Sequence, residues 1–299
     1  MNNPDDPNAP LRGFPIRRLP RRLRARPRLQ GQSFNRILPN LLTMTGLCAG
    51  LTSMRFALEG RFGSAAVAIL VAAIIDGLDG RLARLLKTTS RFGAEFDSLS
   101  DFLCFGVAPG FVLYLWSLQA FGGFGFAPCV IFAVCMALRL ARFNAAIEGG
   151  PRPAYAYNFF TGVPAPAGAG LALFPLFVGL EASTLGWDGL LVFARHPALV
   201  AAALLGTALL SVSILPVWSF KNFKVPTPFI LPLLIGVGLY LAFLLADPWA
   251  ALAAAGLVYL GMLPFSARSY ARLKREAEAV RPEIFSAVVP ERKGVNESG

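Results

Sequence analysis

Long apolar runs recur along the chain between residues 39 and 267, separated by short stretches that are richer in polar residues. A helix needs about 20 consecutive apolar residues to cross the hydrocarbon core of a bilayer. The runs are long enough to predict eight membrane-spanning helices. The predicted spans cover residues 39–58, 63–86, 98–120, 124–146, 161–181, 197–215, 228–246 and 248–267.

This pattern favours an all-α polytopic membrane helix bundle over a β-barrel. Inside a bilayer, only helices and closed barrels satisfy all backbone hydrogen bonds. The strict alternation of apolar and polar residues that marks barrel strands is absent from the sequence. The last two spans are separated only by Ala246-Asp247-Pro248 and should form a tight hairpin. We therefore expect six helices followed by a two-helix hairpin.

The composition supports a membrane protein. Of the 299 residues, 55% are hydrophobic and 15% are charged, whereas soluble domains carry about 25% charged residues. This balance excludes an ordinary soluble enzyme and a disordered protein. The four cysteines lie in apolar stretches without a C-x-x-C pair, and there is a single histidine. A disulfide framework and a zinc site are therefore not expected.

The net charge of +11 is concentrated in segments outside the apolar runs. Residues 12–36 carry nine arginines within a segment that also contains prolines and leucines. We predict that residues 1–35 form a disordered, basic cytoplasmic arm held against anionic lipid headgroups. The expected partners of this charge are membrane lipids and not nucleic acid.

Basic residues alternate between the loops and predict the orientation of the chain. They follow the second span (Lys87, Arg91), the fourth (Arg152) and the sixth (Lys221, Lys224), and they recur in the C-terminal tail. The intervening loops carry few basic residues. Cytoplasmic loops are enriched in Lys and Arg, so both termini are expected in the cytoplasm.

Four aspartates flank the loop between the second and third spans. Asp76 and Asp79 are three residues apart, and Asp97 and Asp101 are four apart. Each spacing places both members of a pair on one face of a helix. The short connection through residues 87–90 makes the two helices antiparallel neighbours. The four carboxylates are therefore expected to face one space at one depth.

Such a cluster needs positive charge, because four like charges repel one another and charge at membrane depth is costly. Hard divalent cations such as Mg²⁺ or Mn²⁺ prefer oxygen ligands and bridge phosphates. Two such cations could clamp a pyrophosphate, while Gly80 and Gly93 would allow close approach and Arg81 and Arg84 would add positive charge. The pattern indicates phosphoryl transfer; an ion-paired helix interface is the alternative.

Written out, the stretch is Asp76-Gly-Leu-Asp79-Gly80-Arg-Leu-Ala83-Arg84, eight residues, Gly93, three residues, Asp97, three residues and Asp101. It matches D-x-x-D-G-x-x-A-R-x8-G-x3-D-x3-D, the signature of the CDP-alcohol phosphotransferases, at every fixed position. Further segments make the chain resemble the bacterial integral-membrane CDP-diacylglycerol–serine O-phosphatidyltransferases. These are Pro39-Asn40-Leu-Leu-Thr43, Phe96-Asp-Ser-Leu-Ser-Asp101, Leu138-Arg-Leu-Ala-Arg-Phe-Asn144 and Phe160-Thr-Gly-Val-Pro-Ala-Pro166. Ser100 stands where the common form has Ala.

The resemblance implies a domain organisation. The catalytic core would cover residues 36–225 and contain six helices. The C-terminal transmembrane hairpin, residues 226–267, and a cytoplasmic tail, residues 268–299, would lie outside that core. The resemblance also implies a location in the inner membrane of a bacterium and suggests a homodimer.

The resemblance also implies roles for the residues of the signature. Asp76, Asp79, Asp97 and Asp101 would hold two divalent cations, Mg²⁺ or Mn²⁺. Asp101 would also act as the general base on the acceptor hydroxyl. The CDP-diacylglycerol would be accommodated and contacted by the small and basic positions of the signature. Gly80, Ala83 and Gly93 would leave room for the cytidine and ribose, and Arg84 would contact a phosphate.

L-Serine is the acceptor that the later segments favour. Arg139 and Arg142 are cationic candidates for its carboxylate, and Asn40, Thr43 and Asn144 are neutral candidates. The two arginines could instead anchor a span at the membrane surface. The alternatives are another acceptor, namely choline, glycerol 3-phosphate or an inositol phosphate, or, more remotely, a membrane transporter.

Overall fold

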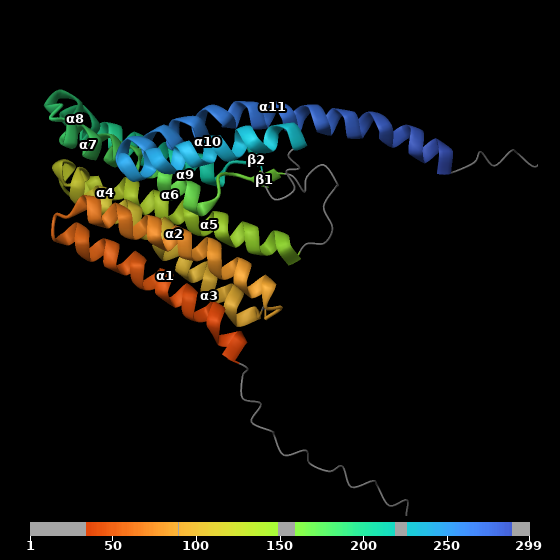
Figure 1. Cartoon of the computed structure of the whole chain (residues 1–299), viewed down its shortest axis with the longest axis horizontal. Helices are drawn as coiled ribbons and strands as arrows, with labels where there is room; N and C mark the ends of the chain where they lie inside the picture. Colours follow the sequence, from red (N-terminus) through yellow and green to blue (C-terminus); the bar gives the residue numbers. More distant parts are fainter. Residues whose placement is uncertain (1–33, 89, 149–158, 219–225, 289–299) are drawn as a thin grey trace, which may run out of the picture. The chain divides into compact units, whose positions relative to one another are not determined.

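The computed structural model describes residues 34–88, 90–148, 159–218 and 226–288. Helices dominate this part of the chain, as the apolar runs predict. The first two helices, α1 (Phe34–Leu58) and α2 (Phe62–Leu85), form an antiparallel pair (Figure 1). The predicted arm lies outside the described residues except at its end, because α1 begins at Phe34.

The third span contains a local change of helix type. Its parts are α3 (Arg91–Asp101), a π-helical stretch η1 (Phe102–Val107) and α4 (Ala108–Trp116). The Ser90 side chain caps α3 by accepting a hydrogen bond from the Gly93 N–H, at 3.0 Å. Pro109 lacks an N–H and its ring crowds the carbonyl four residues earlier, which explains widening of the helix before it. The widened stretch begins directly after Asp101.

The helices that follow include two bent pairs. Their bounds are η2, a 3₁₀ stretch (Leu118–Phe126), α5 (Ala127–Glu148), α6 (Ala165–Ala172), α7 (Phe174–Leu185), α8 (Asp188–Ala194) and α9 (Pro197–Val212). The α6–α7 pair bends by 45° and the α8–α9 pair by 49°. Pro175 and Pro197 lie just inside the second helix of each pair, a position that suits proline.

Two short strands were not predicted. β1 (Phe159–Thr161) pairs antiparallel with β2 (Pro216–Trp218). The predicted spans 161–181 and 197–215 are therefore wrong at these ends, since α6 begins at Ala165 and α9 ends at Val212. Gly162 turns the chain with a φ of +77°, and its N–H donates to the Leu215 carbonyl. Pro164 is the N-cap residue of α6, and Pro216 is the first residue of β2.

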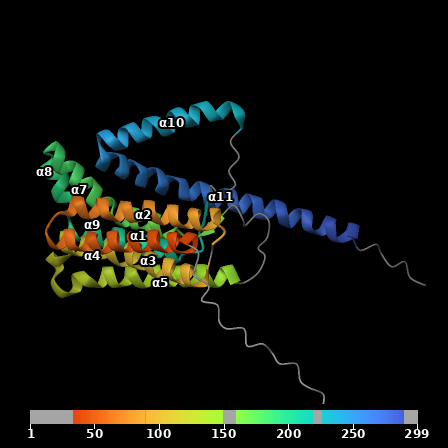
Figure 2. The same ribbon diagram turned by 60° about the horizontal axis from the view of Figure 1, so that its bottom comes forward.

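The C-terminal hairpin consists of α10 (Thr227–Ala246) and α11 (Pro248–Val288). α11 packs on α7 and on β2, and Ser266 donates to the Pro216 carbonyl at 2.7 Å. α10 has no buried residue and is joined to the rest mainly through the hairpin turn (Figure 2). α11 therefore connects the hairpin to the bundle, while α10 presents apolar side chains all round.

The main core runs between α1, α2, η1, α4, α5, α7 and α9. Close backbone approach is built in where α1 crosses η1, because a Cβ on Gly50 would lie 2.5 Å from the Cys104 Sγ. Within the described residues, six helices are long and apolar enough to cross a membrane, and the number reaches eight if each bent pair is one span. This agrees with the predicted all-α polytopic bundle.

Candidate active site

The four aspartates of the predicted cluster lie on two neighbouring elements. Asp76 and Asp79 belong to α2, and Asp97 and Asp101 belong to α3. The carboxylate oxygens of Asp76, Asp97 and Asp101 lie within 4.8 Å of one another. Asp79 is 4% exposed and lines the same narrow cavity as the other three. The structure thus brings together the carboxylates that the spacing placed in one space.

Helix α1 and the π-helical stretch close this cavity. The other lining residues are Thr43, Gly46, Ala72, Ser100, Cys104 and Phe105. Ser100 is buried and its hydroxyl donates to the Thr43 carbonyl at 3.4 Å. The Cys104 thiol donates to the Gly46 carbonyl at 3.4 Å. These contacts hold α1 against the helix that carries Asp97 and Asp101.

Thr43 contacts the carboxylate cluster directly. Its Oγ1 donates to Asp79 Oδ2 at 2.7 Å and lies 3.1 Å from the Pro39 carbonyl. The side chain is 6% exposed. A hydrogen bond to a carboxylate fixes the direction of the oxygen that remains free. Thr43 is therefore placed to orient Asp79, in addition to any role in acceptor binding.

The donor set suits a hard divalent cation. Among the described residues, salt bridges join only Glu59 to Arg55 and Arg61, so none of the described Lys or Arg residues forms a salt bridge with the aspartates. Several converging carboxylate oxygens in a half-buried site are the ligands that Mg²⁺ and Mn²⁺ prefer. The residues present therefore fit a divalent metal, and the alternative of an Asp–Arg ion-paired interface has no supporting contact in the described chain.

The small and basic positions of the signature lie next to this cavity. A Cβ on Gly80 would meet only Arg84 Nη2, at 4.0 Å, so the space beside Gly80 is open. Ala83 is half-buried and Arg84 is exposed. Gly93 is more confined, because a Cβ there would lie 2.9 Å from the Asn40 Oδ1. Asn40 thus lies against the start of α3, beside the cluster.

Arg139 is a cationic candidate for acceptor binding and lies on α5. Its side chain is 9% exposed, and its charge interacts with that of Asp101. Nε donates to the Val163 carbonyl at 2.5 Å. The two terminal nitrogens have no hydrogen-bond partner within the described chain. A buried guanidinium with free donors is a ready partner for a carboxylate.

Arg142 and Asn144 hold neighbouring elements in place. Arg142 donates to the carbonyls of Val212, Ser213 and Thr161, at 2.7, 3.1 and 3.3 Å. It thereby ties α5 to the end of α9 and to β1. Asn144 Nδ2 donates to the Ser98 Oγ at 3.0 Å and ties α5 to α3.

Two buried polar side chains were not anticipated from the sequence. The Tyr259 hydroxyl, on α11, and the Ser211 hydroxyl, on α9, are buried and lack a hydrogen-bond partner among the described residues. Tyr259 packs against the cluster that contains Val163, whose carbonyl binds Arg139, and its hydroxyl interacts electrostatically with Arg139. Both residues lie in apolar runs, where the sequence gives no signal for them. A buried polar atom without a partner favours a ligand or water at that place.

The chain is similar to known proteins over most of its length. Residues 36–212 match the family model CDP-alcohol phosphatidyltransferase, and residues 229–264 match CDP-alcohol phosphatidyltransferase 2. A CDP-diacylglycerol–serine O-phosphatidyltransferase of Mycobacterium tuberculosis is 37% identical over 87% of the chain and 86% of its own length. That of Mycobacterium leprae is 37% identical over 85% and 82%. That of Helicobacter pylori is 42% identical over 46% and 56%.

Proposed function

Because the chain belongs to the CDP-alcohol phosphatidyltransferase family, we propose that it transfers the phosphatidyl group of CDP-diacylglycerol to the hydroxyl of L-serine. The products are phosphatidylserine and CMP, and the reaction belongs to phospholipid biosynthesis. One observation carries the proposal: the converging carboxylates of Asp76, Asp97 and Asp101, in a chain 37% identical to a serine-specific relative over most of both lengths.

The four aspartates are the ligands for two divalent cations, Mg²⁺ or Mn²⁺. When bound, such cations neutralise the pyrophosphate and stabilise the charge that develops in the transition state. Thr43 keeps Asp79 oriented through its 2.7 Å hydrogen bond. The space beside Gly80 and Ala83 accommodates the cytidine and ribose. Gly93, which has no side chain, allows the backbone of α3 to come close to the nucleotide. The exposed Arg84 contacts a phosphate.

The chemical step is a single displacement at phosphorus. The seryl hydroxyl oxygen attacks the phosphorus that carries the diacylglycerol, and the bond between that phosphorus and the oxygen of CMP breaks. Asp101 accepts the hydroxyl proton on a carboxylate oxygen, and CMP leaves with the bonding electrons. Positioning and electrostatic stabilisation supply most of the rate enhancement.

Arg139 is the best-placed candidate for the serine carboxylate. It is buried, its terminal nitrogens are free within the described chain, and it interacts with Asp101. The Tyr259 hydroxyl, which lacks a hydrogen-bond partner among the described residues and interacts with Arg139, is a further donor. Arg142 is a weaker candidate because backbone carbonyls occupy its guanidinium. Asn40 and Asn144 lie beside α3 and are neutral candidates for acceptor binding.

The apolar helices make the chain a membrane protein. We place it in the inner membrane of a bacterium, with both termini and the carboxylate cluster on the cytoplasmic side, because Lys87 and Arg91 lie in the connection between the two helices that carry the cluster and cytoplasmic loops are enriched in basic residues. Membrane lipids surround it, and a homodimer is proposed from the family resemblance.

An acceptor panel tests the proposed function. Purified protein in detergent receives CDP-diacylglycerol and Mn²⁺ or Mg²⁺, and labelled serine, choline, glycerol 3-phosphate or inositol phosphate is added separately. We expect CMP release with serine alone, lost on chelation. Metal-dependent CMP release with another acceptor would support the role of the aspartates and show that serine is not the acceptor. If folded protein releases no CMP with any acceptor, the proposed enzyme activity is wrong and a transporter is favoured.

A further inference from the structure

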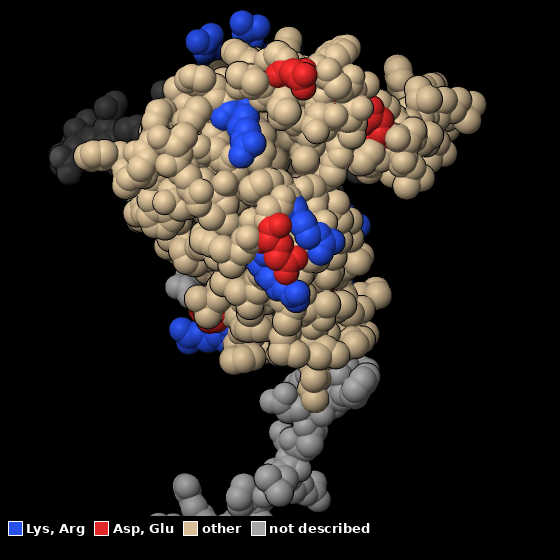
Figure 3. Space-filling model, turned by 90° about the vertical axis from the view of Figure 1, so that its left-hand side faces the viewer, with Lys and Arg blue, Asp and Glu red and all other residues tan. Residues whose placement is uncertain are grey.

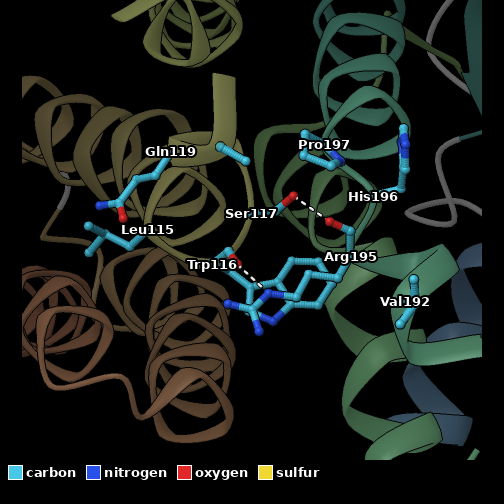
Figure 4. A pocket seen from close by; sticks show the side chains of 9 residues that line it. Leu115, Trp116, Ser117, Gln119, Val192, Arg195, His196 and Pro197 are labelled. Atoms are coloured by element: carbon cyan, nitrogen blue, oxygen red, sulfur yellow. Dashed lines mark hydrogen bonds between the residues drawn. The ribbon is translucent and has the colours of Figure 1, made fainter. Parts of the chain in front are cut away.

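A second cavity lies at the end of the bundle opposite the carboxylate cluster. It has a volume of about 410 Å³ and is formed where α4 ends and where α8 meets α9. The size falls within the roughly 300–1,000 Å³ of typical ligand sites. It is lined by Leu115, Trp116, Ser117, Gln119, Ala120, Val192, Arg195, His196 and Pro197 (Figure 4). No residue proposed for phosphatidyl transfer lies in it.

The structure holds Arg195 in one orientation within this cavity. Its Nε donates to the Trp116 carbonyl at 2.7 Å, and its own carbonyl accepts the Ser117 hydroxyl at 2.6 Å (Figure 4). The two terminal nitrogens have no protein partner among the described residues. The guanidinium is thus fixed at its base and retains two free nitrogens, an arrangement suited to bidentate contact with phosphate oxygens.

Arg195 forms no ion pair in the described part of the chain. Both basic and acidic side chains are visible on this side of the molecule (Figure 3). Of the described arginines here, Arg55 and Arg61 both contact Glu59, at 2.8 and 3.4 Å. Arg195 has no carboxylate within 4 Å in the described part of the chain. An anion is therefore the expected complement of this site.

The surroundings of the cavity indicate that the anion is carried by a lipid. The cavity lies at the ends of membrane spans, because the third span ends at Trp116 and α9 begins at Pro197. Val192 and Phe193 expose 70% and 63% of their surface beside it. Apolar side chains at this level would contact acyl chains, whereas a free phosphate would gain nothing from them.

We propose that this cavity binds a phospholipid by its headgroup phosphate, with Arg195 as the phosphate ligand and the acyl chains along the exposed side of α8. The site is separate from the one that uses CDP-diacylglycerol. A lipid held here joins α4, α8 and α9 at the bend between α8 and α9.

The experiment uses full-length protein, delipidated in detergent, and 1-palmitoyl-2-oleoyl-phosphatidylglycerol. Native mass spectrometry measures the dissociation constant of each bound lipid. We expect Arg195→Gln to weaken one lipid about tenfold to a hundredfold, as for a lost charge-assisted hydrogen bond. Val192→Glu removes no packing, since Val192 is largely exposed, and it should weaken the same lipid by placing a carboxylate in the cavity. Arg61→Gln, at the same end but paired with Glu59, should leave binding unchanged.

Three results would overturn the proposal. If Arg195→Gln and Val192→Glu both bind the lipid as tightly as the wild type, the cavity is not the lipid site. If Arg61→Gln weakens lipid binding equally, the effect is due to net charge. Arg195-dependent thermal stabilisation by inorganic phosphate, without any by phosphatidylglycerol, would assign the site to a free anion. Diacylglycerol, which lacks the phosphate, should not bind saturably, and the KM for CDP-diacylglycerol should be the same in all variants.

Discussion

The substitution Gly80→Ala tests the proposed nucleotide site without disturbing the fold. A Cβ at Gly80 would meet only the far end of a flexible side chain, Arg84 Nη2, at 4.0 Å. The substitution therefore disturbs no packing. Alanine in an exposed helix interior is about 1 kcal/mol more favourable than glycine, so α2 should become slightly more stable. If the cytidine lies against Gly80, the same methyl group would occupy space that the substrate needs.

The cost to the substrate follows from ordinary overpacking. Adding a methyl group to a filled contact costs about 1–3 kcal/mol, and each 1.4 kcal/mol is a factor of about ten. We expect the KM for CDP-diacylglycerol to rise about tenfold to a hundredfold, with an unchanged or higher thermal unfolding midpoint. CMP release at varied CDP-diacylglycerol and saturating serine measures the first quantity, and a detergent-phase melting curve measures the second.

Gly77→Ala is the matched control. Gly77 lies on the same helix, and a Cβ there would meet nothing within 4 Å, but it occupies a variable position of the signature. It should gain the same helix stability and keep a wild-type KM. A wild-type KM for Gly80→Ala, or an equal rise for both variants, would refute the placement of the cytidine beside Gly80.

Three further predictions concern side chains whose partners are known. Asp101→Asn should lower CMP release more than about a hundredfold, as expected for loss of a general base, while CDP-diacylglycerol binding persists; lost binding would make Asp101 purely a metal ligand. Thr43→Val removes the hydrogen bond to Asp79 and should raise the Mn²⁺ concentration for half-maximal rate about tenfold. Thr43→Ser keeps a hydroxyl and should restore the wild-type value. If it does not, the hydroxyl of Thr43 does not orient Asp79. Arg142→Ala loses three carbonyl contacts and should destabilise the protein by about 2–3 kcal/mol, measured by thermal unfolding. An altered KM for serine at wild-type stability would instead make Arg142 an acceptor ligand.

The sequence was sufficient to predict the carboxylate cluster because its geometry depends on local spacing. Three- and four-residue intervals fix the faces of α2 and α3, and a short loop makes the two helices neighbours. The apolar runs likewise predicted the spans, because their length is set by the bilayer.

Features that depend on contacts between distant segments could not be predicted from the sequence. The β1–β2 pair joins segments more than fifty residues apart, and strands this short give no periodic signal. The role of Arg142 depends on the carbonyls of Val212 and Ser213, which only the fold brings to it. Arg139 and Arg142 look alike in the sequence, yet one keeps free donors and the other does not.

The C-terminal hairpin is connected to the rest of the bundle by contacts as well as by family likeness. The predicted catalytic core ends at residue 225, yet residues 229–264 also match a family model and contacts cross that point at several places. Ser266 binds the Pro216 carbonyl, and the Tyr270 ring packs on Phe159 with centroids 5.1 Å apart. Tyr259 brings a buried hydroxyl towards Arg139. α11 thus supports the β1–β2 pair and closes the region beside the proposed acceptor site, which makes the hairpin part of the same folded unit as the aspartates.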